Sequence, residues 1–177
     1  MSAEANAGLV IVVMGVSGSG KSTLGQALAE AEGWDFQEGD ALHPRANIDK
    51  MRGGEPLDDG DRAPWLERIS AWIANELRLH RHGVITCSAL KRDYRQRLMQ
   101  AGTGVRFVHL DAAHDVLQRR LRQRDHFMPA SLLDSQLQTL EAPLGEDATL
   151  IVSSEDPPGV VLAKVREWIA HQTPGTR

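Results

Sequence analysis

An uninterrupted apolar run at residues 9–14 leads directly into the string Gly-Val-Ser-Gly-Ser-Gly-Lys-Ser at residues 15–22. The string fits the pattern GxxxxGK(S/T), and apolar residues recur at helical spacing in the segment that follows it. Because the run shows no polar alternation, it is typical of a parallel strand covered on both faces. This order of central strand, glycine-rich loop and helix predicts a loop that binds the phosphates of a nucleotide.

The residues of this loop have separate expected roles. Its glycines let successive backbone N–H groups curl around phosphate oxygens at the positive end of the following helix. Lys21 is expected to reach the β- and γ-phosphates, and the Ser22 hydroxyl is expected to bind Mg²⁺. The residues predicted to bind ATP here are Gly15, Val16, Ser17, Gly18, Ser19, Gly20, Lys21, Ser22 and Thr23.

The composition limits what kind of protein this is. Its 177 residues, 41% of them hydrophobic, predict a single domain with one sizeable core, in which about residues 1–8 form a flexible N-terminus. A formal net charge of -4 argues against nucleic acid as a partner. The only cysteine, Cys87, is predicted to be buried, and it excludes an internal disulfide. Because no signal-peptide pattern and no apolar segment of membrane-spanning length occur, we expect a cytoplasmic protein with no membrane partner.

Strand-like and helix-like segments alternate along the chain. This alternation predicts an α/β fold, the three-layer fold of P-loop NTPases, in which a five-stranded parallel sheet is flanked by helices. The expected strands are residues 9–14, 34–37, 83–87, 105–110 and 148–152. The expected helices are residues 21–31, 62–81, 91–100, 113–124, 129–141 and 158–171, with Asp61 as the cap of the second and Trp65 near the site.

Two segments interrupt this alternation and are expected to carry specificity. Residues 40–61 are polar and rich in Gly and Pro, with one short helical piece at 44–51, and we interpret them as a substrate-binding insert. Residues 124–142 follow an arginine-rich helix end and are predicted to form a small lid, because phosphoryl transfer requires cations and the exclusion of water. Arg120 and Arg124 are expected to contact ATP, and Arg124 to act in catalysis; a solvated basic helix face is the alternative.

The strand expected at residues 83–87 ends without the acidic residue that closes a Walker B strand. The metal and the attacking oxygen then need another carboxylate. Asp40 follows the second expected strand, and ligands of α/β sheets collect beyond the carboxyl ends of the strands. We therefore predict that Asp40 binds the acceptor and, partly through water, Mg²⁺; a turn cap before His43 is the alternative.

Eight further strings, in order along the chain, carry more specific information. They are Glu-Gly-Asp-Ala-Leu-His-Pro at 38–44, Asn-Ile-Asp-Lys-Met at 47–51, Gly-Glu-Pro-Leu-Asp-Asp at 54–59, Asp-Arg at 61–62, Pro-Trp-Leu at 64–66, Cys-Ser-Ala-Leu-Lys at 87–91, Tyr-Arg at 94–95 and His-Phe-Met-Pro at 126–129. Together they resemble the gluconokinase family, over residues 10 to about 140. The resemblance implies an adenylate-kinase-like fold and the phosphorylation of D-gluconate at its 6-hydroxyl by ATP, usually in a homodimer.

The resemblance also implies roles for single residues. Asp40 is expected to accept a hydrogen bond from the 6-hydroxyl, and cations and mixed polar groups are suitable partners for the carboxylate and hydroxyls of gluconate. Lys91 and Arg95 lie four residues apart and are expected to converge on one anion, with an exposed charged helix face as the alternative. The residues expected to bind gluconate are Asp40, His43, Lys50, Arg52, Arg62, Ser88, Lys91 and Arg95; those expected in catalysis are Lys21, Asp40 and Arg124; those expected to bind Mg²⁺ are Ser22 and Asp40.

One departure from the family pattern leaves the lid arginine open. The family usually places two residues between this arginine and the His-Phe-Met string, whereas one residue separates Arg124 from His126 here. Arg120, Arg122 and Arg124 therefore remain alternatives for contact with the transferring phosphoryl group. Two other functions also stay open: a related small-molecule kinase that acts on shikimate or another sugar acid, and an ATP-binding regulator without turnover.

Overall fold

The computed structural model of the protein describes residues 7–123 and 132–172. The strands are β1 (Val10–Met14), β2 (Asp35–Gln37), β3 (Gly83–Thr86), β4 (Val105–Asp111) and β5 (Thr149–Ser153). The helices are α1 (Lys21–Glu32), α2 (Arg45–Arg52), α3 (Asp59–Arg78), α4 (Arg92–Met99), α5 (His114–Arg122), α6 (Leu132–Thr139) and α7 (Pro158–Ala170), with a short 3₁₀ helix η2 (Gly39–Leu42). None of the described helices is long and apolar enough to cross a membrane.

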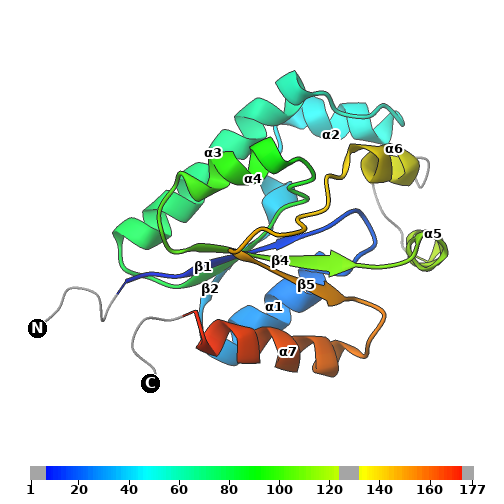
Figure 1. The fold of residues 1–177 in the computed structure, drawn as a ribbon. Helices are drawn as coiled ribbons and strands as arrows, with labels where there is room; N and C mark the ends of the chain where they lie inside the picture. Colours follow the sequence, from blue (N-terminus) through cyan, green and yellow to red (C-terminus); the bar gives the residue numbers. More distant parts are fainter. Residues whose placement is uncertain (1–6, 124–131, 173–177) are drawn as a thin grey trace, which may run out of the picture.

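The five strands form one parallel sheet in the order β2-β3-β1-β4-β5 (Figure 1). All five residues of β1 are fully buried, and β1 pairs with β3 on one side and β4 on the other. The prediction that the first apolar run is the central strand is therefore confirmed. Because all strands run in one direction, the loops that follow them gather at one edge of the sheet, which is where the candidate site lies.

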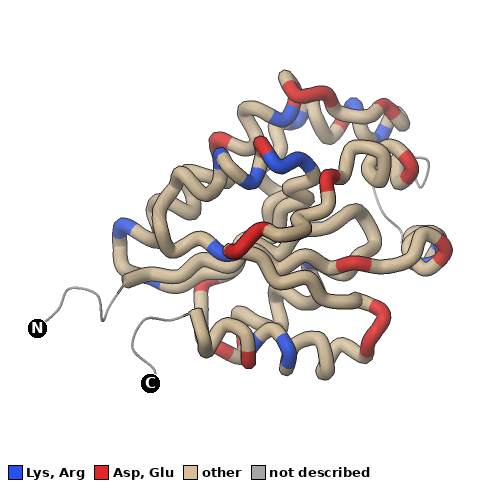
Figure 2. The backbone as a smooth tube through the Cα atoms, in the orientation of Figure 1, with Lys and Arg blue, Asp and Glu red and all other residues tan. Residues whose placement is uncertain are grey.

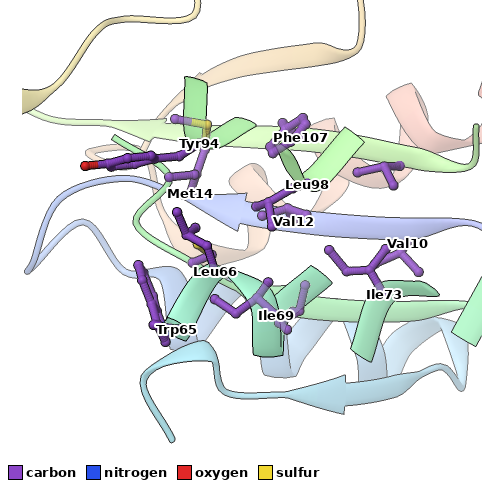
Figure 3. Close-up of a cluster of buried hydrophobic side chains, with 14 residues drawn as sticks. Val10, Val12, Met14, Trp65, Leu66, Ile69, Ile73, Tyr94, Leu98 and Phe107 are labelled. Atoms are coloured by element: carbon purple, nitrogen blue, oxygen red, sulfur yellow. The ribbon is translucent and has the colours of Figure 1, made fainter. Parts of the chain in front are cut away.

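Helices cover both faces of the sheet and make two cores. On one face, α3 and α4 pack against β1, and Figure 3 shows Val12 and Met14 among side chains such as Leu66 and Leu98. On the other face, α1 and α7 pack against Ile11 and other residues of the alternate side of β1. Burial of each such aliphatic side chain stabilises the fold by about 1.5–3 kcal/mol, and this double cover explains why β1 carries no polar residue.

Charged residues surround this sheet. Figure 2 shows β1, β3 and β5 without a charged residue, while acidic and basic residues lie mainly on helices and loops. Cys87, directly after β3, is 1% exposed, as predicted, and burial raises the pKa of its thiol to about 12. A thiol with such a pKa is a packing group and not a nucleophile.

The helix α3 begins three residues before the expected position, and its cap differs from the prediction. Asp58 is the cap residue: its carboxylate accepts from the Asp61 backbone N–H at 2.7 Å, and the Asp61 carboxylate accepts from the Asp58 N–H at 2.9 Å. This reciprocal capping box stabilises the first turn, because each carboxylate satisfies an N–H that the helix leaves without a partner. Asp61 is thus the third helical residue and not the cap.

The ends of the described segments also refine the expected boundaries. Gly8 is buried, and a Cβ added to it would lie 2.4 Å from the Arg81 backbone oxygen. The insert at 40–61 contains η2 as well as the short helix α2.

A third apolar cluster joins Val16 of the glycine-rich loop to Leu117 of α5 and Leu133 of α6, and so fixes the two helices against the site.

Candidate active site

The glycine-rich loop turns sharply between β1 and α1. Gly15, Gly18 and Gly20 have φ values of 149°, 84° and 96°, in the region that favours glycine. At Gly15 the close approach of the chain matters as well, because an added Cβ would lie 2.7 Å from the Ser19 hydroxyl oxygen. The first N–H groups of α1 and the positive end of its dipole therefore face the loop, as an anion site requires.

Lys21 is the first residue of α1, and its side chain folds back along the loop. Its Nζ donates to the backbone oxygens of Gly15 at 3.0 Å and Val16 at 3.1 Å. These carbonyls hold the ammonium at the mouth of the loop, where it also lines a cavity with Asp40. The ammonium group of Lys21 thus lies between the loop and the carboxylate of Asp40.

The loop borders two cavities. The first, called the outer cavity here, has the composition of a nucleotide pocket. It is lined by Gly18, Ser19, Gly20, Thr23, Leu24, Ala27, Leu110, Arg120, Ser154, Asp156, Pro158 and Val161. Arg120 donates to the backbone oxygens of Gly18 at 3.2 Å and Ser154 at 2.8 Å, and so links the loop to the segment after β5. Its planar guanidinium forms part of a pocket that also has apolar walls, such as Leu24, Leu110 and Val161, a combination suited to a purine ring beside phosphates.

Glu38 is a residue that the sequence analysis did not select. Its carboxylate accepts from the Ser22 hydroxyl at 2.8 Å and from the Thr86 hydroxyl at 2.5 Å. Thr86 is the last residue of β3, where a Walker B strand would carry its acid, and the acid comes instead from the end of the neighbouring strand β2. Glu38, like Asp40, follows the carboxyl end of β2, where ligands of α/β sheets collect, so its position in the sequence already indicated a role in the site.

The second cavity that the loop borders is called the inner cavity here. It is lined by Ser17, Lys21, Asp40, His43, Met51, Pro56, Leu57, Arg62, Trp65, Ser88, Leu90, Leu132, Ser135 and Gln136. Four of the residues expected to bind gluconate therefore lie together here: Asp40, His43, Arg62 and Ser88. They come from η2, from the loop after it, from α3 and from the end of β3, so the insert and the sheet edge build the cavity jointly.

Two aromatic rings form one wall of this inner cavity. The imidazole of His43 stacks on the indole of Trp65, with ring centroids 4.2 Å apart and planes inclined by 13°. Trp65 is itself fixed, because its Nε1 donates to the Gly39 backbone oxygen at 2.8 Å. Burial lowers the pKa of His43 to about 4; the negative charge of Asp40 opposes this shift and the positive charge of Arg62 adds to it. His43 is therefore a neutral imidazole at neutral pH.

Arg62 is held by a chain of hydrogen bonds from α4. Its Nη1 donates to the Tyr94 hydroxyl at 3.1 Å, and that hydroxyl donates to the carboxylate of Asp59. Lys91 donates to the same carboxylate at 2.8 Å, and this contact and the Tyr94 hydrogen bond lower the pKa of Asp59. Arg62 is 9% exposed, so its charge acts inside the cavity where water screens little.

Four other residues expected to bind gluconate do not line this cavity. Lys50 pairs with the carboxylate of Asp61 at 2.7 Å, which raises the pKa of Lys50 and supports the first turn of α3. Arg52 is exposed at the end of α2, and Lys91 is paired with Asp59. Arg95, the fourth, is buried within the fold.

Arg95 and Lys91 do not converge on one anion. Lys91 precedes α4 as its cap residue, with φ of -97° and ψ of 146°, so the two do not share a helical face. Arg95 is 2% exposed; it pairs with Glu146 at 3.0 Å and donates to the backbone oxygens of Ala89 and Leu90. Its guanidinium thus orders the segment after Ser88 instead of facing the cavity.

The lid expected at residues 124–142 is described only from residue 132 onward. Arg124, with the His-Phe-Met-Pro string, lies outside the described residues, and its catalytic role stays a prediction. In α6, Gln136 accepts from the Ser17 backbone N–H at 2.7 Å and its own Nε2 contacts the Ser17 hydroxyl at 3.2 Å. This helix therefore reaches the glycine-rich loop directly.

The glycine-rich loop follows the central strand of a parallel sheet, and it has a nucleotide-type cavity on one side and a polar acceptor cavity on the other. These features define a P-loop kinase of small molecules. A family model described as AAA domain matches residues 10–143. The gluconokinase of Gluconobacter oxydans is 51% identical over 88% of this chain and 88% of its own length, and the thermoresistant gluconokinase of Escherichia coli is 39% identical over 88% and 91%. A solved gluconokinase from Sinorhizobium meliloti superposes with a TM-score of 0.83 at 47% identity, covering 93% of each chain. The chain belongs to this AAA domain family and, within it, to the gluconokinases.

Proposed function

We propose that this protein transfers the γ-phosphoryl group of ATP to the 6-hydroxyl of D-gluconate. The observation that carries the proposal is the position of the glycine-rich loop between two cavities. One cavity has Arg120 and the outer side of the loop, and the other has Lys21, Asp40, His43 and Arg62. A nucleotide and a polyhydroxy acid bound in these cavities would meet at the loop.

The residues of the inner cavity divide the work of the reaction. Asp40 accepts the hydrogen bond of the 6-hydroxyl, Lys21 neutralises charge on the β- and γ-phosphates, and Arg62 pairs with the anionic end of the acceptor. The hydroxyl oxygen bonds to the γ-phosphorus, the bond from that phosphorus to the bridging oxygen of ADP breaks, and the hydroxyl proton passes to Asp40 and then to solvent. The guanidinium of Arg62 has five N–H donors, of which Tyr94 takes one.

The oxygen atoms near Ser22 fit a magnesium ion. Ser22 and Glu38 place a hydroxyl and a carboxylate 2.8 Å apart at the start of α1, and Mg²⁺ bound to nucleotide phosphates commonly uses one or two protein oxygens and several waters. We propose that Ser22 binds the ion and that Glu38 and Asp40 hold its water molecules. When bound, the ion supplies positive charge to the phosphate oxygens. Glu38 meanwhile fixes the Ser22 hydroxyl through its own contact with Thr86.

Acceptor specificity tests the proposal. ADP release is measured by a coupled assay with purified protein, ATP and Mg²⁺, in parallel with gluconate, shikimate, glucose, nucleoside monophosphates or no acceptor. We expect a rate with gluconate far above that of the other acceptors. A rate with gluconate equal to the rate without acceptor would refute the proposed activity, and a higher rate with shikimate would reassign the acceptor.

Two wider proposals rest on the family resemblance. We propose that the protein is a homodimer and that it acts in the cytoplasm. Sedimentation velocity of the full chain tests the first, with a single species of twice the 19.4 kDa chain mass expected. Cell fractionation of the source organism tests the second.

A further inference from the structure

Behind the wall of the inner cavity lies a buried asparagine, Asn47, to which the roles above assign nothing. Asn47 lies in α2, is 4% exposed, and contacts His43 without lining the cavity itself. Its Nδ2 donates to the backbone oxygen of Asp61 at 2.8 Å. A carbonyl oxygen can only accept, so this contact fixes which end of the carboxamide is the NH₂ group.

The same NH₂ group determines the state of the imidazole. The second contact of Asn47 Nδ2 is with His43 Nδ1 at 3.2 Å. Because an amide nitrogen donates and does not accept, Nδ1 must be the acceptor nitrogen of a neutral ring. The ring proton is then on Nε2, on the side of Asp40. Stacking on Trp65 prevents the ring from tilting out of this orientation.

We propose that Asn47 is a positioning residue that holds His43 as the neutral Nε2–H tautomer, so that His43 donates a hydrogen bond to the same substrate hydroxyl that donates to Asp40. His43 Nε2 and the nearer Asp40 oxygen are 4.0 Å apart. That separation is too long for a direct hydrogen bond, but an oxygen placed between them can lie about 2.8 Å from both. This inference rests on the proposed function for the identity of the hydroxyl.

The tautomer matters for how the hydroxyl is presented. The hydroxyl donates a hydrogen bond to Asp40 and accepts one from His43 Nε2–H with one of its lone pairs. Its other lone pair is then available to attack the γ-phosphorus. A ring with a bare Nε2 would compete with Asp40 for the hydroxyl proton. A protonated ring would pair with Asp40 and occupy the carboxylate. Among the residues that the structure describes, two charges shift the pKa of this ring: Asp40 of η2 favours its protonation, and Arg62 of α3 disfavours it. Lys21 is a further cation that lines the same cavity.

The tautomer can be read directly by nitrogen NMR of the full-length protein with labelled histidine. The His43 signals are identified by their loss in His43→Gln. At pH 7 we expect His43 to show a protonated Nε2 and a bare Nδ1. In Asn47→Asp, whose carboxylate accepts instead of donating, we expect Nδ1 to become protonated. The matched control Asn75→Asp, on the exposed face of α3, leaves the pattern unchanged. A protonated Nδ1 in the unaltered protein, or an unchanged pattern in Asn47→Asp, overturns the proposal.

A double-mutant cycle tests the consequence for turnover. We expect Asn47→Asp to lower kcat/KM for gluconate by about 10- to 100-fold, with the KM for ATP unchanged. The amide of His43→Gln can donate from nearly the position of Nε2, so adding Asn47→Asp to His43→Gln is expected to change kcat/KM by less than about two-fold. Equal losses in both backgrounds overturn the proposal, since Asn47 then acts without His43.

The two kinds of readout separate this inference from the proposed function. If Asn47→Asp does not fold, the NMR pattern of the unaltered protein and the kinetics of Asn47→Ser decide instead. If the expected tautomer is found but gluconate is not phosphorylated, the proposed activity fails and the tautomer stands. If gluconate is phosphorylated by a protein with the other tautomer, the inference fails alone.

Discussion

At the scale of single residues, the carboxylate of Asp40 makes the sharpest expectation. Asp40→Asn keeps the shape of the side chain and removes its capacity to take the hydroxyl proton, so we expect kcat to fall by about 10²- to 10⁴-fold. The coupled assay measures the rate, and thermal melting checks that the fold is unchanged. A rate near that of the unaltered enzyme would remove Asp40 from the mechanism.

Glu38 leads to a prediction about magnesium. Glu38→Gln retains the side-chain volume but weakens the negative charge that accepts from Ser22 and Thr86. We expect the Mg²⁺ concentration for half-maximal rate to rise by about 10- to 100-fold, as is typical when an outer partner of a metal ligand is changed. The rate is measured across a magnesium titration at saturating substrates. Glu55→Gln, at an exposed position in the insert, is the control and should leave the titration unchanged.

The loop residues and Asp40 could be selected from the sequence because their spacing follows directly from their chemistry. Glu38 could not be selected in the same way, because the missing Walker B acid calls for one carboxylate after β2, whereas the structure has two there. Their side chains are separated by Gly39 and diverge, one toward Ser22 and one toward the inner cavity. Only the course of the chain after the strand decides which carboxylate serves which partner.

At the scale of elements, the link between α3 and α4 sets the position of Arg62. Tyr94→Phe keeps the packing of the ring but removes the hydroxyl that joins Arg62 to Asp59. We expect the KM for gluconate to rise by about 10-fold, with a smaller change in kcat and none in the KM for ATP, because the lost contact serves the acceptor cavity alone. Steady-state kinetics with each substrate varied measures this. Arg97→Gln, on the exposed side of α4, should have no effect; an equal rise in the KM for ATP would contradict the assignment.

Helix boundaries explain why part of the site could not be predicted. The spacing of Lys91 and Arg95 implies one face only if both residues are helical, and Lys91 is the cap residue instead. Similarly, the start of α3 was hidden by Gly60 and Pro64, which are poor helix formers, and the capping box of Asp58 and Asp61 overrides them. In both places a local hydrogen bond decides a boundary that periodicity leaves open.

At the scale of the whole molecule, buried His43 couples stability to pH. Its pKa is about 4 in the folded protein and about 6.5 when unfolded, so between these values the unfolded chain binds more protons. The free energy of unfolding therefore decreases as the pH falls from 6.5 to 4, by at most about 3 kcal/mol from this group. His43→Gln should remove that part of the acid sensitivity.

Denaturant titrations at pH 7 and at pH 4.5 measure this difference. The decrease in the free energy of unfolding between the two pH values should be smaller in His43→Gln than in the unaltered protein. The exposed His171→Gln, after α7, should behave like the unaltered protein. Identical decreases in all three proteins would show that His43 is solvated in the native state.

The architecture as a whole could be predicted well from the sequence. The alternation of apolar runs and amphipathic segments leaves few arrangements besides a parallel sheet between helices. The apolar run 9–14 contains β1, which is central and is the one strand among the described residues with no polar position on either face. How the two cavities join could not be predicted in this way, because it depends on the contacts of the three consecutive residues 38–40. Glu38 contacts Ser22, the backbone oxygen of Gly39 contacts Trp65, and Asp40 lines the inner cavity.

Those three residues also bear on how the acceptor preference of such an enzyme can be changed. Gly39 lies so close to β3 that an added Cβ would be 1.7 Å from the Thr86 backbone oxygen, and its own oxygen anchors Trp65. A side chain at position 39 would therefore displace the backbone of β3 or of residues 38–40. A protein engineer who wants another acceptor would vary positions 43–62, which shape the inner cavity. Positions 38–40 would be kept, so that the nucleotide-binding part of the site stays unchanged.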